Sequence, residues 1–196
     1  MASDFTQQAN TFFSQSTDGF SFDQFPQLAS RYFQPRTLTR GTSWLRPGQV
    51  CGRIAFIKSG MLRAFVETDT GKHTRWAFLP GQFFTSVTSF GQQLPAEEHI
   101  EALEDSELME ITHTNWQMLS KEHPILKTYW TRTLEELIAC YENRLHSLLI
   151  GDAEGRYKYF LKHYPEFVLQ VPQKYVAEML GIAPRHLSRI RKEISR

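Results

Sequence analysis

The sequence predicts an α+β fold: a strand-rich roll, then one long helix, then two short helices joined by a tight turn. Between about residues 36 and 115, short runs of β-branched and aromatic residues are broken by Gly and Pro at close spacing, which indicates strands and turns. From residue 124 onward, apolar residues recur every three or four positions, which indicates helix. Residues 171–196 are basic and hold two short helical patterns separated by a glycine.

The composition is that of a folded chain with one moderate domain or two small ones. Of the 196 residues, 41% are hydrophobic and 22% are charged, which excludes wholesale disorder. Two cysteines, Cys51 and Cys140, are too few for a disulfide framework or a four-thiolate cluster within one chain. The sequence shows no apolar run of bilayer length and no signal-peptide pattern, so we expect a cytoplasmic protein without a membrane partner.

The strand-rich part is predicted to span residues 22–123, after a polar arm at residues 1–21. A short helix is expected at residues 22–34. The strands are expected at residues 53–58, 61–67 and 73–79, with a final pair within 100–112. Asp69-Thr70-Gly71 predicts a tight hairpin, because glycine accepts the positive φ of such turns. Short strands at regular turn spacing favour a small barrel or jelly roll.

A long helix is predicted over residues 124–150, because Pro124 suits a first helical turn and Gly151 is a natural stop. At 1.5 Å per residue this helix is about 40 Å long, more than a small roll can cover. Its apolar stripe therefore needs a partner, and a second copy of itself is the simplest one. Packing across its own domain is the alternative. The predicted homodimer contacts are Trp130, Leu134, Leu137, Tyr141 and Leu145.

Residues 151–196 are predicted to form a C-terminal domain, which begins with a helix at residues 153–163. Pro165 and Pro172 then bracket a connector. The remaining segment has the pattern of a helix-turn-helix, in which Gly181 ends the first helix and Pro184 begins the second.

The second of these helices has two distinct faces. Leu187, Ile190 and Ile194 form its predicted buried stripe. The opposite face presents residues that can donate to base edges and phosphates: Arg185, Ser188, Arg189 and Lys192.

Charge is distributed unevenly along the chain. Residues 171–196 hold six Lys or Arg against two acids, a net charge of +4, whereas the preceding part holds 16 basic and 19 acidic residues, a net charge of −3. A solvated basic surface is the alternative explanation. The tight turn, the paired prolines and the local charge together favour double-stranded DNA as a partner.

Three segments carry a resemblance to the Crp/Fnr family of bacterial transcription regulators: KSGMLR at 58–63, LPGQFF at 79–84 and APRHLSRIRK at 183–192. The last resembles the form common in Bacteroidetes members. The resemblance covers residues 22–196 and implies a jelly-roll effector domain like that of cyclic-nucleotide-binding proteins, a homodimer joined by the long helix, and DNA half-sites one helical turn apart. It also implies that an effector acts by favouring one of two dimer arrangements.

The residues that hold a cyclic nucleotide in this family are not found at the matching positions. The resemblance implies a Gly-Glu pair, whose Glu holds the ribose, and an Arg-Ser or Arg-Thr pair, whose Arg holds the phosphate. Counted from Pro80, these positions are Thr85-Ser86 and Ala96-Glu97. A short apolar side chain and a carboxylate do not attract an anion, so cyclic AMP is not expected to bind in the usual mode. These four residues are the candidates for an effector pocket. Two alternatives are open: the pocket binds an unknown small molecule, or the roll binds no ligand and serves only as a scaffold for the dimer.

Other function classes have weaker support. An iron–sulfur form would need several N-terminal cysteines, and a haem form would use lone residues such as His73, His99 or Cys51. The seven histidines are dispersed and no nucleophile, P-loop or dinucleotide motif occurs, so no catalytic residue, metal or cofactor is predicted, and a metal-dependent enzyme is an alternative only.

A scaffold that acts through a protein partner such as RNA polymerase is the other alternative. Many family members carry a β-hairpin after the second helix, and none follows here, so we expect backbone contacts from Gln173, Lys174 or Arg196.

Overall fold

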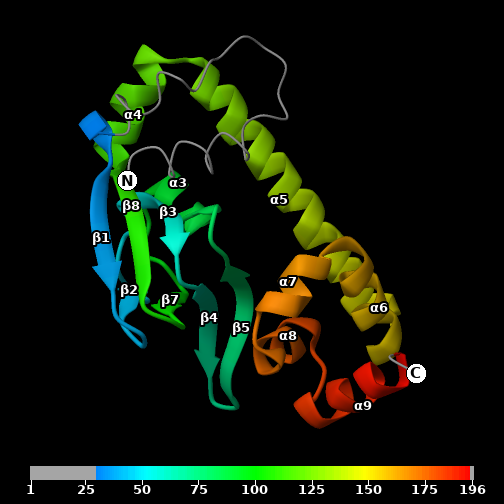
Figure 1. Ribbon diagram of the computed structural model, residues 1–196. Coiled ribbons are helices and arrows are strands. Elements are labelled where there is room, and N and C mark those ends of the chain that lie inside the picture. Colours follow the sequence, from blue (N-terminus) through cyan, green and yellow to red (C-terminus); the bar gives the residue numbers. More distant parts are fainter. Residues whose placement is uncertain (1–29, 195–196) are drawn as a thin grey trace. The chain divides into compact units, whose positions relative to one another are not determined.

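The computed structural model describes residues 30–194 (Figure 1). The arm predicted at residues 1–21, most of the helix predicted at 22–34, and Arg196 lie outside the described residues. The chain forms two compact units. Of the described residues, unit 1 comprises 30–64 and Phe78–Thr131, and unit 2 comprises Phe65–Ala77 and 132–194.

The order of elements confirms the predicted fold class, with strands first and helices after them. The strands are β1 (Gln34–Leu38), β2 (Ser43–Leu45), β3 (Arg53–Ser59), β4 (Leu62–Thr68), β5 (Gly71–Phe78), β6 (Phe83–Phe84), β7 (His99–Ala102) and β8 (Ser106–Thr112). The described helices are α3 (Val87–Gln92), α4 (His113–Glu122), α5 (Ile125–Ile150), α6 (Ala153–His163), α7 (Pro165–Gln170), α8 (Gln173–Leu180) and α9 (Pro184–Ile194).

Two antiparallel sheets form the roll. One has the order β1-β8-β3-β6, and Figure 1 shows β1 beside β8, where Gln34 pairs with Glu110. The other has the order β2-β7-β4-β5. The turn before β4 requires a glycine: Gly60 has φ +88°, and a Cβ there would lie 2.2 Å from Ser106 Oγ.

The core of unit 1 lies between the inward faces of the strands. Its largest fully buried side chains include Phe56, Leu62, Ile100, Leu108 and Ile111, which come from both sheets. Each contributes about 1.5–3 kcal/mol by leaving water, so this apolar set stabilises the roll without a ligand.

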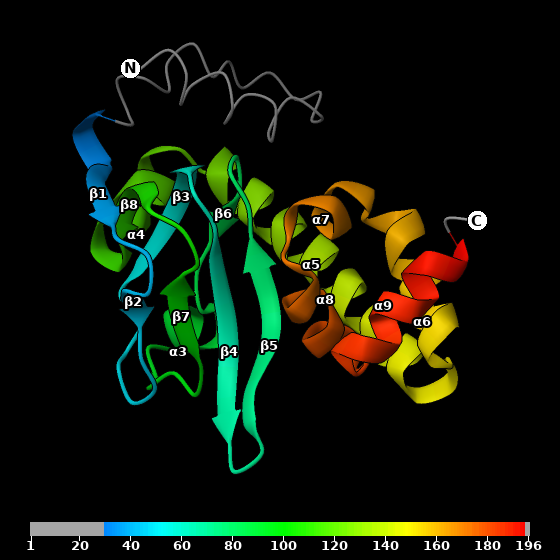
Figure 2. The ribbon, with the colours of Figure 1, turned by 60° about the horizontal axis from the view of Figure 1, so that its bottom comes forward.

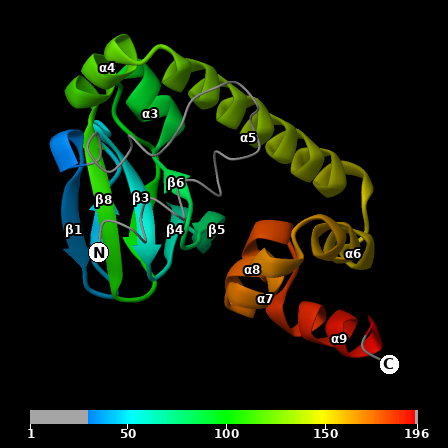
Figure 3. The ribbon, with the colours of Figure 1, turned by 45° about the horizontal axis from the view of Figure 1, so that its top comes forward.

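The long helix forms as predicted, and α5 runs without interruption over Ile125–Ile150 (Figure 3). Its first turns pack in unit 1, where Leu126 is buried. The Trp130 ring contacts Phe90 and Trp116, with centroid distances of 6.2 and 5.5 Å. The N-terminal part of the helix thus has a partner within its own chain.

Unit 2 contains one helix that the sequence did not predict. Residues 165–170 form α7 rather than a connector, because Pro165 stands at the first helical position, where its missing N–H is no loss. Phe167 and Val168 of this helix are buried, so it contributes to the core of unit 2. The helix α6 has the predicted bounds, and its N-terminus is capped by Asp152, whose carboxylate accepts from Gly155 N.

Candidate nucleic-acid interface and effector domain

The helices α8 and α9 form a helix-turn-helix within unit 2 (Figure 2). Gly181 ends α8 in the left-handed conformation, with φ 61°. Ala177 is fully buried where the two helices pack, as its small side chain predicts. Leu187 and Ile190 are buried under α9, but Ile194 is exposed, so its predicted place in the buried stripe is wrong. Ile194 stands in the last turn of α9, one turn beyond Ile190.

The face of α9 opposite the buried stripe carries cations. Arg185, Arg189 and Lys192 are exposed, and Ser188 is partly buried. Among residues 30–194, these three cations have no carboxylate within ion-pair distance. A cationic face without a carboxylate partner favours an anionic ligand over a structural role.

The other predicted DNA contacts lie at the start of α8. The Nε2 atom of Gln173 is buried and has no hydrogen-bond partner among the described residues. Lys174 is exposed, with Nζ 4.5 Å from the centroid of the Tyr175 ring. The two neighbours therefore differ: Lys174 presents its charge to solvent and Gln173 does not present its amide nitrogen.

The hairpin of β4 and β5 is joined to α8 inside unit 2. Thr74 donates its backbone N–H and its hydroxyl to Glu178 Oε2, at 3.0 and 2.5 Å. Arg144 of α5 donates to the carbonyl oxygens of Arg75 and Met179, at 2.7 and 2.9 Å. Burial lowers the pKa of Arg144 from its ordinary value. Polar contacts thus link the hairpin to the first helix of the helix-turn-helix.

An aromatic cluster strengthens this link. The Trp76 ring of β5 lies 5.1 Å from Phe167 and 6.1 Å from Tyr141, measured between centroids. It also contacts Phe160 and Tyr164, both at 6.3 Å. Each such pair adds about 0.5–1.5 kcal/mol beyond area burial. No local sequence signal predicts that a strand hairpin packs with the C-terminal helices.

Two of the residues predicted to line an effector pocket, Thr85 and Ser86, use their hydroxyl groups in hydrogen bonds to other parts of the roll. Thr85, Ser86 and Ala96 are buried, whereas Glu97 is exposed. The Ser86 hydroxyl donates to Glu98 Oε1 at 2.8 Å, which ties the two segments together. Among these residues no cation is available to a phosphate.

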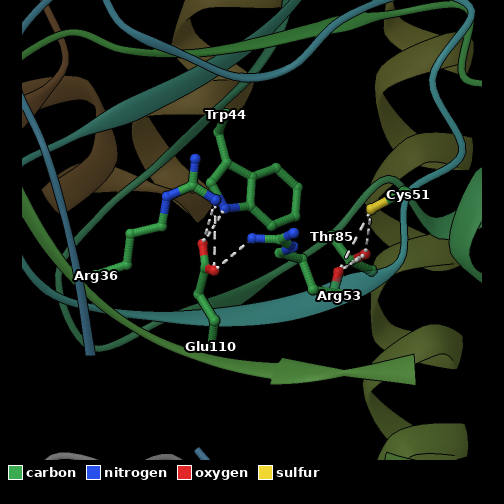
Figure 4. Close-up of polar contacts among 6 residues, drawn as sticks. All are labelled: Arg36, Trp44, Cys51, Arg53, Thr85 and Glu110. Atoms are coloured by element: carbon green, nitrogen blue, oxygen red, sulfur yellow. Dashed lines mark hydrogen bonds and ion pairs between the residues drawn. The ribbon is translucent and has the colours of Figure 1, made fainter. Parts of the chain in front are cut away.

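The buried carboxylate of Glu110 gathers a group of residues that the sequence did not predict (Figure 4). Its oxygens accept from Trp44 Nε1 at 2.5 Å and from Arg36 and Arg53 NH1 at 3.2 and 2.9 Å. Beside this group, the Thr85 hydroxyl donates to the carbonyl oxygen of Arg53 at 2.9 Å. One carboxylate thus holds two guanidinium groups and an indole in place.

The predicted dimer contacts fall into two sets. Trp130 and Tyr141 contact rings within their own units, and Leu134 and Leu137 are partly buried. Leu145 has 57% of its surface exposed. Three further exposed apolar residues on α5 are not among the predicted dimer contacts: Ile138 at 57%, Leu148 at 37% and Leu149 at 75%.

Within residues 30–194, no three His, Cys, Asp or Glu side chains lie together in a way that could hold a metal ion. No helix of this part of the chain has the length and apolarity to cross a membrane.

Comparison with known proteins identifies the strand-rich part. Residues 35–123 match the family described as cyclic nucleotide-binding domain. No curated protein sequence is similar enough to this chain to count as a relative.

Solved structures of similar fold extend over most of the chain. The catabolite activator protein of Thermus thermophilus is 21% identical, with 91% of this chain and 85% of that chain covered and a TM-score of 0.59. A CooA mutant from Carboxydothermus hydrogenoformans is 18% identical, with 91% and 81% covered and a TM-score of 0.69. A regulator from Eubacterium rectale assigned to the Crp/Fnr family is 17% identical, with 90% and 84% covered and a TM-score of 0.64. Residues 35–123 therefore match the cyclic nucleotide-binding domain family, and the chain shares the fold of these solved structures, which include a Crp/Fnr-family regulator.

Proposed function

We propose that this chain is a DNA-binding transcription regulator of the Crp/Fnr type, which acts in the cytoplasm and is not an enzyme. The observation that carries the proposal is the cationic face of α9, where Arg185, Arg189 and Lys192 are exposed without carboxylate partners among the described residues. The opposite face is held by the buried Leu187 and Ile190, so the cations stand on a rigid element. Arginine pairs with the O6 and N7 atoms of guanine, and lysine pairs with phosphate.

Selection of bound duplexes from a random pool tests this proposal. We expect a two-fold symmetric site whose half-sites are about 10 base pairs apart, because dimers of this type read successive major grooves on one side of the duplex. A protein with Arg185→Ala and Arg189→Ala together is the matched control and should enrich no sequence. A wild-type pool that stays random after selection, with and without cell metabolite extract, would contradict the proposal.

We further propose that the chain acts as a homodimer through α5. Ile138, Leu145 and Leu149 lie within about 40° of one another around the helix, at 100° per residue. They are exposed, and Leu134 extends the same stripe. This exposed stripe is not the one that the sequence predicts, because it leaves out Trp130 and Tyr141. These two residues pack within their own chain. A second copy of α5 is the partner that continues the stripe.

Two leucines of equal exposure provide the test. Leu149 on α5 and Leu169 on α7 are both 75% exposed. Sedimentation should show a dimer for the wild type and for Leu169→Glu, and a monomer for Leu149→Glu. A monomeric wild type at micromolar concentration, or equal loss in both variants, would remove the basis for this interface.

The roll serves as the regulatory part in this proposal. Its usual nucleotide segment holds no cation among Thr85, Ser86, Ala96 and Glu97, so an effector is a small molecule other than a cyclic nucleotide bound in the usual mode. RNA polymerase is the protein partner that such a regulator would contact on DNA.

A further inference from the structure

A cavity in unit 1 lies at the Glu110 group rather than at the usual nucleotide segment. Its volume is about 380 Å³, within the range of pockets that take small molecules. It is bordered by β1, β2 and the segment that leads into β3. Six of its lining residues matter here: Arg36, Trp44, Arg46, Gln49, Cys51 and Arg53.

Positive charge exceeds negative charge around this cavity. Three guanidinium groups line it, and Glu110 is the one carboxylate in contact with them among the described residues, which leaves two positive charges unmatched. Arg36 and Arg53 pair with Glu110. The Arg46 side chain has no hydrogen bond or ion pair within the described part of the chain. Only its backbone is used: its N–H donates to Gln49 Oε1 at 2.9 Å, and its carbonyl oxygen accepts from Gln49 N at 3.1 Å.

Glu110 positions two of the guanidinium groups without using up their donors. Each guanidinium has five N–H donors. Arg36 and Arg53 each contact the carboxylate through NH1 alone, at 3.2 and 2.9 Å, and their side chains are 33% and 45% exposed. The other N–H groups are therefore oriented and still able to bind an anion, which lowers the entropy lost on binding.

The size of the ligand follows from the aromatic part of the lining. Trp44 is only 7% exposed, and its ring packs against Phe84 with centroids 4.7 Å apart. It therefore offers no open face on which a purine base could stack. A compact anion suits the cavity better than a nucleotide, because guanidinium groups match the planar or tetrahedral oxygens of carboxylate and phosphate.

We propose that this cavity is a binding site for a small organic anion, such as a dicarboxylate or a phosphate ester, held by Arg46 and Arg53 with help from Arg36. The site is distinct from the segment at residues 85–97 and does not depend on DNA binding. It is nevertheless connected to that segment. The Thr85 hydroxyl contacts the Arg53 carbonyl at 2.9 Å and the Cys51 thiol at 3.3 Å, so a ligand that moves residues 51–53 also moves the start of α3 (Figure 4).

Calorimetry with the full chain at low ionic strength tests the site, with succinate and inorganic phosphate as probes. We expect at least one probe to bind with a Kd of about 1 mM or tighter. Arg46→Gln should weaken that binding about ten-fold, because it removes a guanidinium that has no other partner. This variant keeps the fold for the same reason. Arg40→Gln is the control, since Arg40 is exposed and does not line the cavity.

Three results would overturn the proposal. The first is the absence of millimolar binding by either probe to the wild type. The second is equal binding of uncharged succinamide, which would show that the anion is not recognised. The third is an Arg46→Gln protein that binds like the wild type, or an Arg40→Gln protein that loses as much affinity as Arg46→Gln, because either result places the contact elsewhere.

Discussion

The arginines of the roll and the arginines of α9 are the same residue type in opposite situations. Arg36 and Arg53 share the carboxylate of Glu110, and the buried Arg63 donates to Glu101 at 2.7 Å. Arg185 and Arg189 have no carboxylate partner among the described residues. The comparison teaches that a buried carboxylate ties an arginine to the fold and takes up part of its donors, whereas an arginine without such a partner keeps all its N–H groups available to an external anion.

The largest expected effect is on the affinity for cyclic AMP, because the residues that hold it in the usual mode are not at the matching positions. Cyclic AMP should bind no tighter than about 1 mM, about 4 kcal/mol weaker than a micromolar site. The positions expected to face its phosphate are Ala96 and Glu97, and the buried cation of the roll, Arg63, is already neutralised by Glu101. Calorimetry checks this, and a micromolar Kd would mean that an arginine assigned to the fold binds ligand instead.

The next effect tests whether the paired arginines are structural. Glu110→Gln should lower the free energy of unfolding by about 3 kcal/mol, because it removes the charge that faces two guanidinium groups and leaves them without compensation. Glu107→Gln on the same strand is the control. Glu107 is 60% exposed and pairs with Lys58 at 3.4 Å, so its loss should cost less than about 0.5 kcal/mol. Urea denaturation measures both, and equal effects would show that burial of the carboxylate is unimportant.

Much of the fold was predictable because its signals are local. The bounds of α6, the start of α9 at Pro184 and the hairpin turn at Asp69–Gly71 each follow from a cap, a proline or a glycine. The two-residue strand β6 gives no such signal, because it exists through its pairing with β3, where Ala55 faces Phe84. Similarly, the sequence does not predict α7, because a proline such as Pro165 is compatible both with a break and with the first turn of a helix.

The face of α9 and the Glu110 group also differ in how far the sequence predicts them. The face of α9 is predictable because its residues repeat along one helix. The partners of Glu110 lie 57 to 74 residues away in the sequence, so only tertiary pairing brings Arg36, Trp44 and Arg53 together. One sequence signal does indicate that Glu110 is buried. Glu110 stands two residues after the buried Leu108 on β8, and side chains two residues apart on a strand point to the same face.

The third prediction concerns the unpaired arginines. Arg185→Ala and Arg189→Ala should each weaken binding to the selected operator by about 1–3 kcal/mol, and binding to random DNA much less, because an arginine–guanine contact is specific to the base. Both should leave the free energy of unfolding within about 0.5 kcal/mol of the wild type, since exposed side chains without partners contribute little. Fluorescence anisotropy and urea denaturation measure the two quantities. Loss of stability without loss of selectivity would assign these arginines to the fold.

The smallest effect distinguishes two kinds of unpaired cation on one helix. Lys192 lies in the last turn of α9 and is exposed, whereas Arg185 lies in the first turn, where such helices meet base edges. Lys192 should therefore contact phosphate, and each phosphate contact releases about one counterion. Lys192→Ala should weaken operator and random DNA alike and reduce the slope of log affinity against log salt by about one. Titrations at several salt concentrations measure the slope. If Lys192→Ala instead reduces selectivity with an unchanged slope, the end of α9 reads bases, and the division between its first and last turns is wrong.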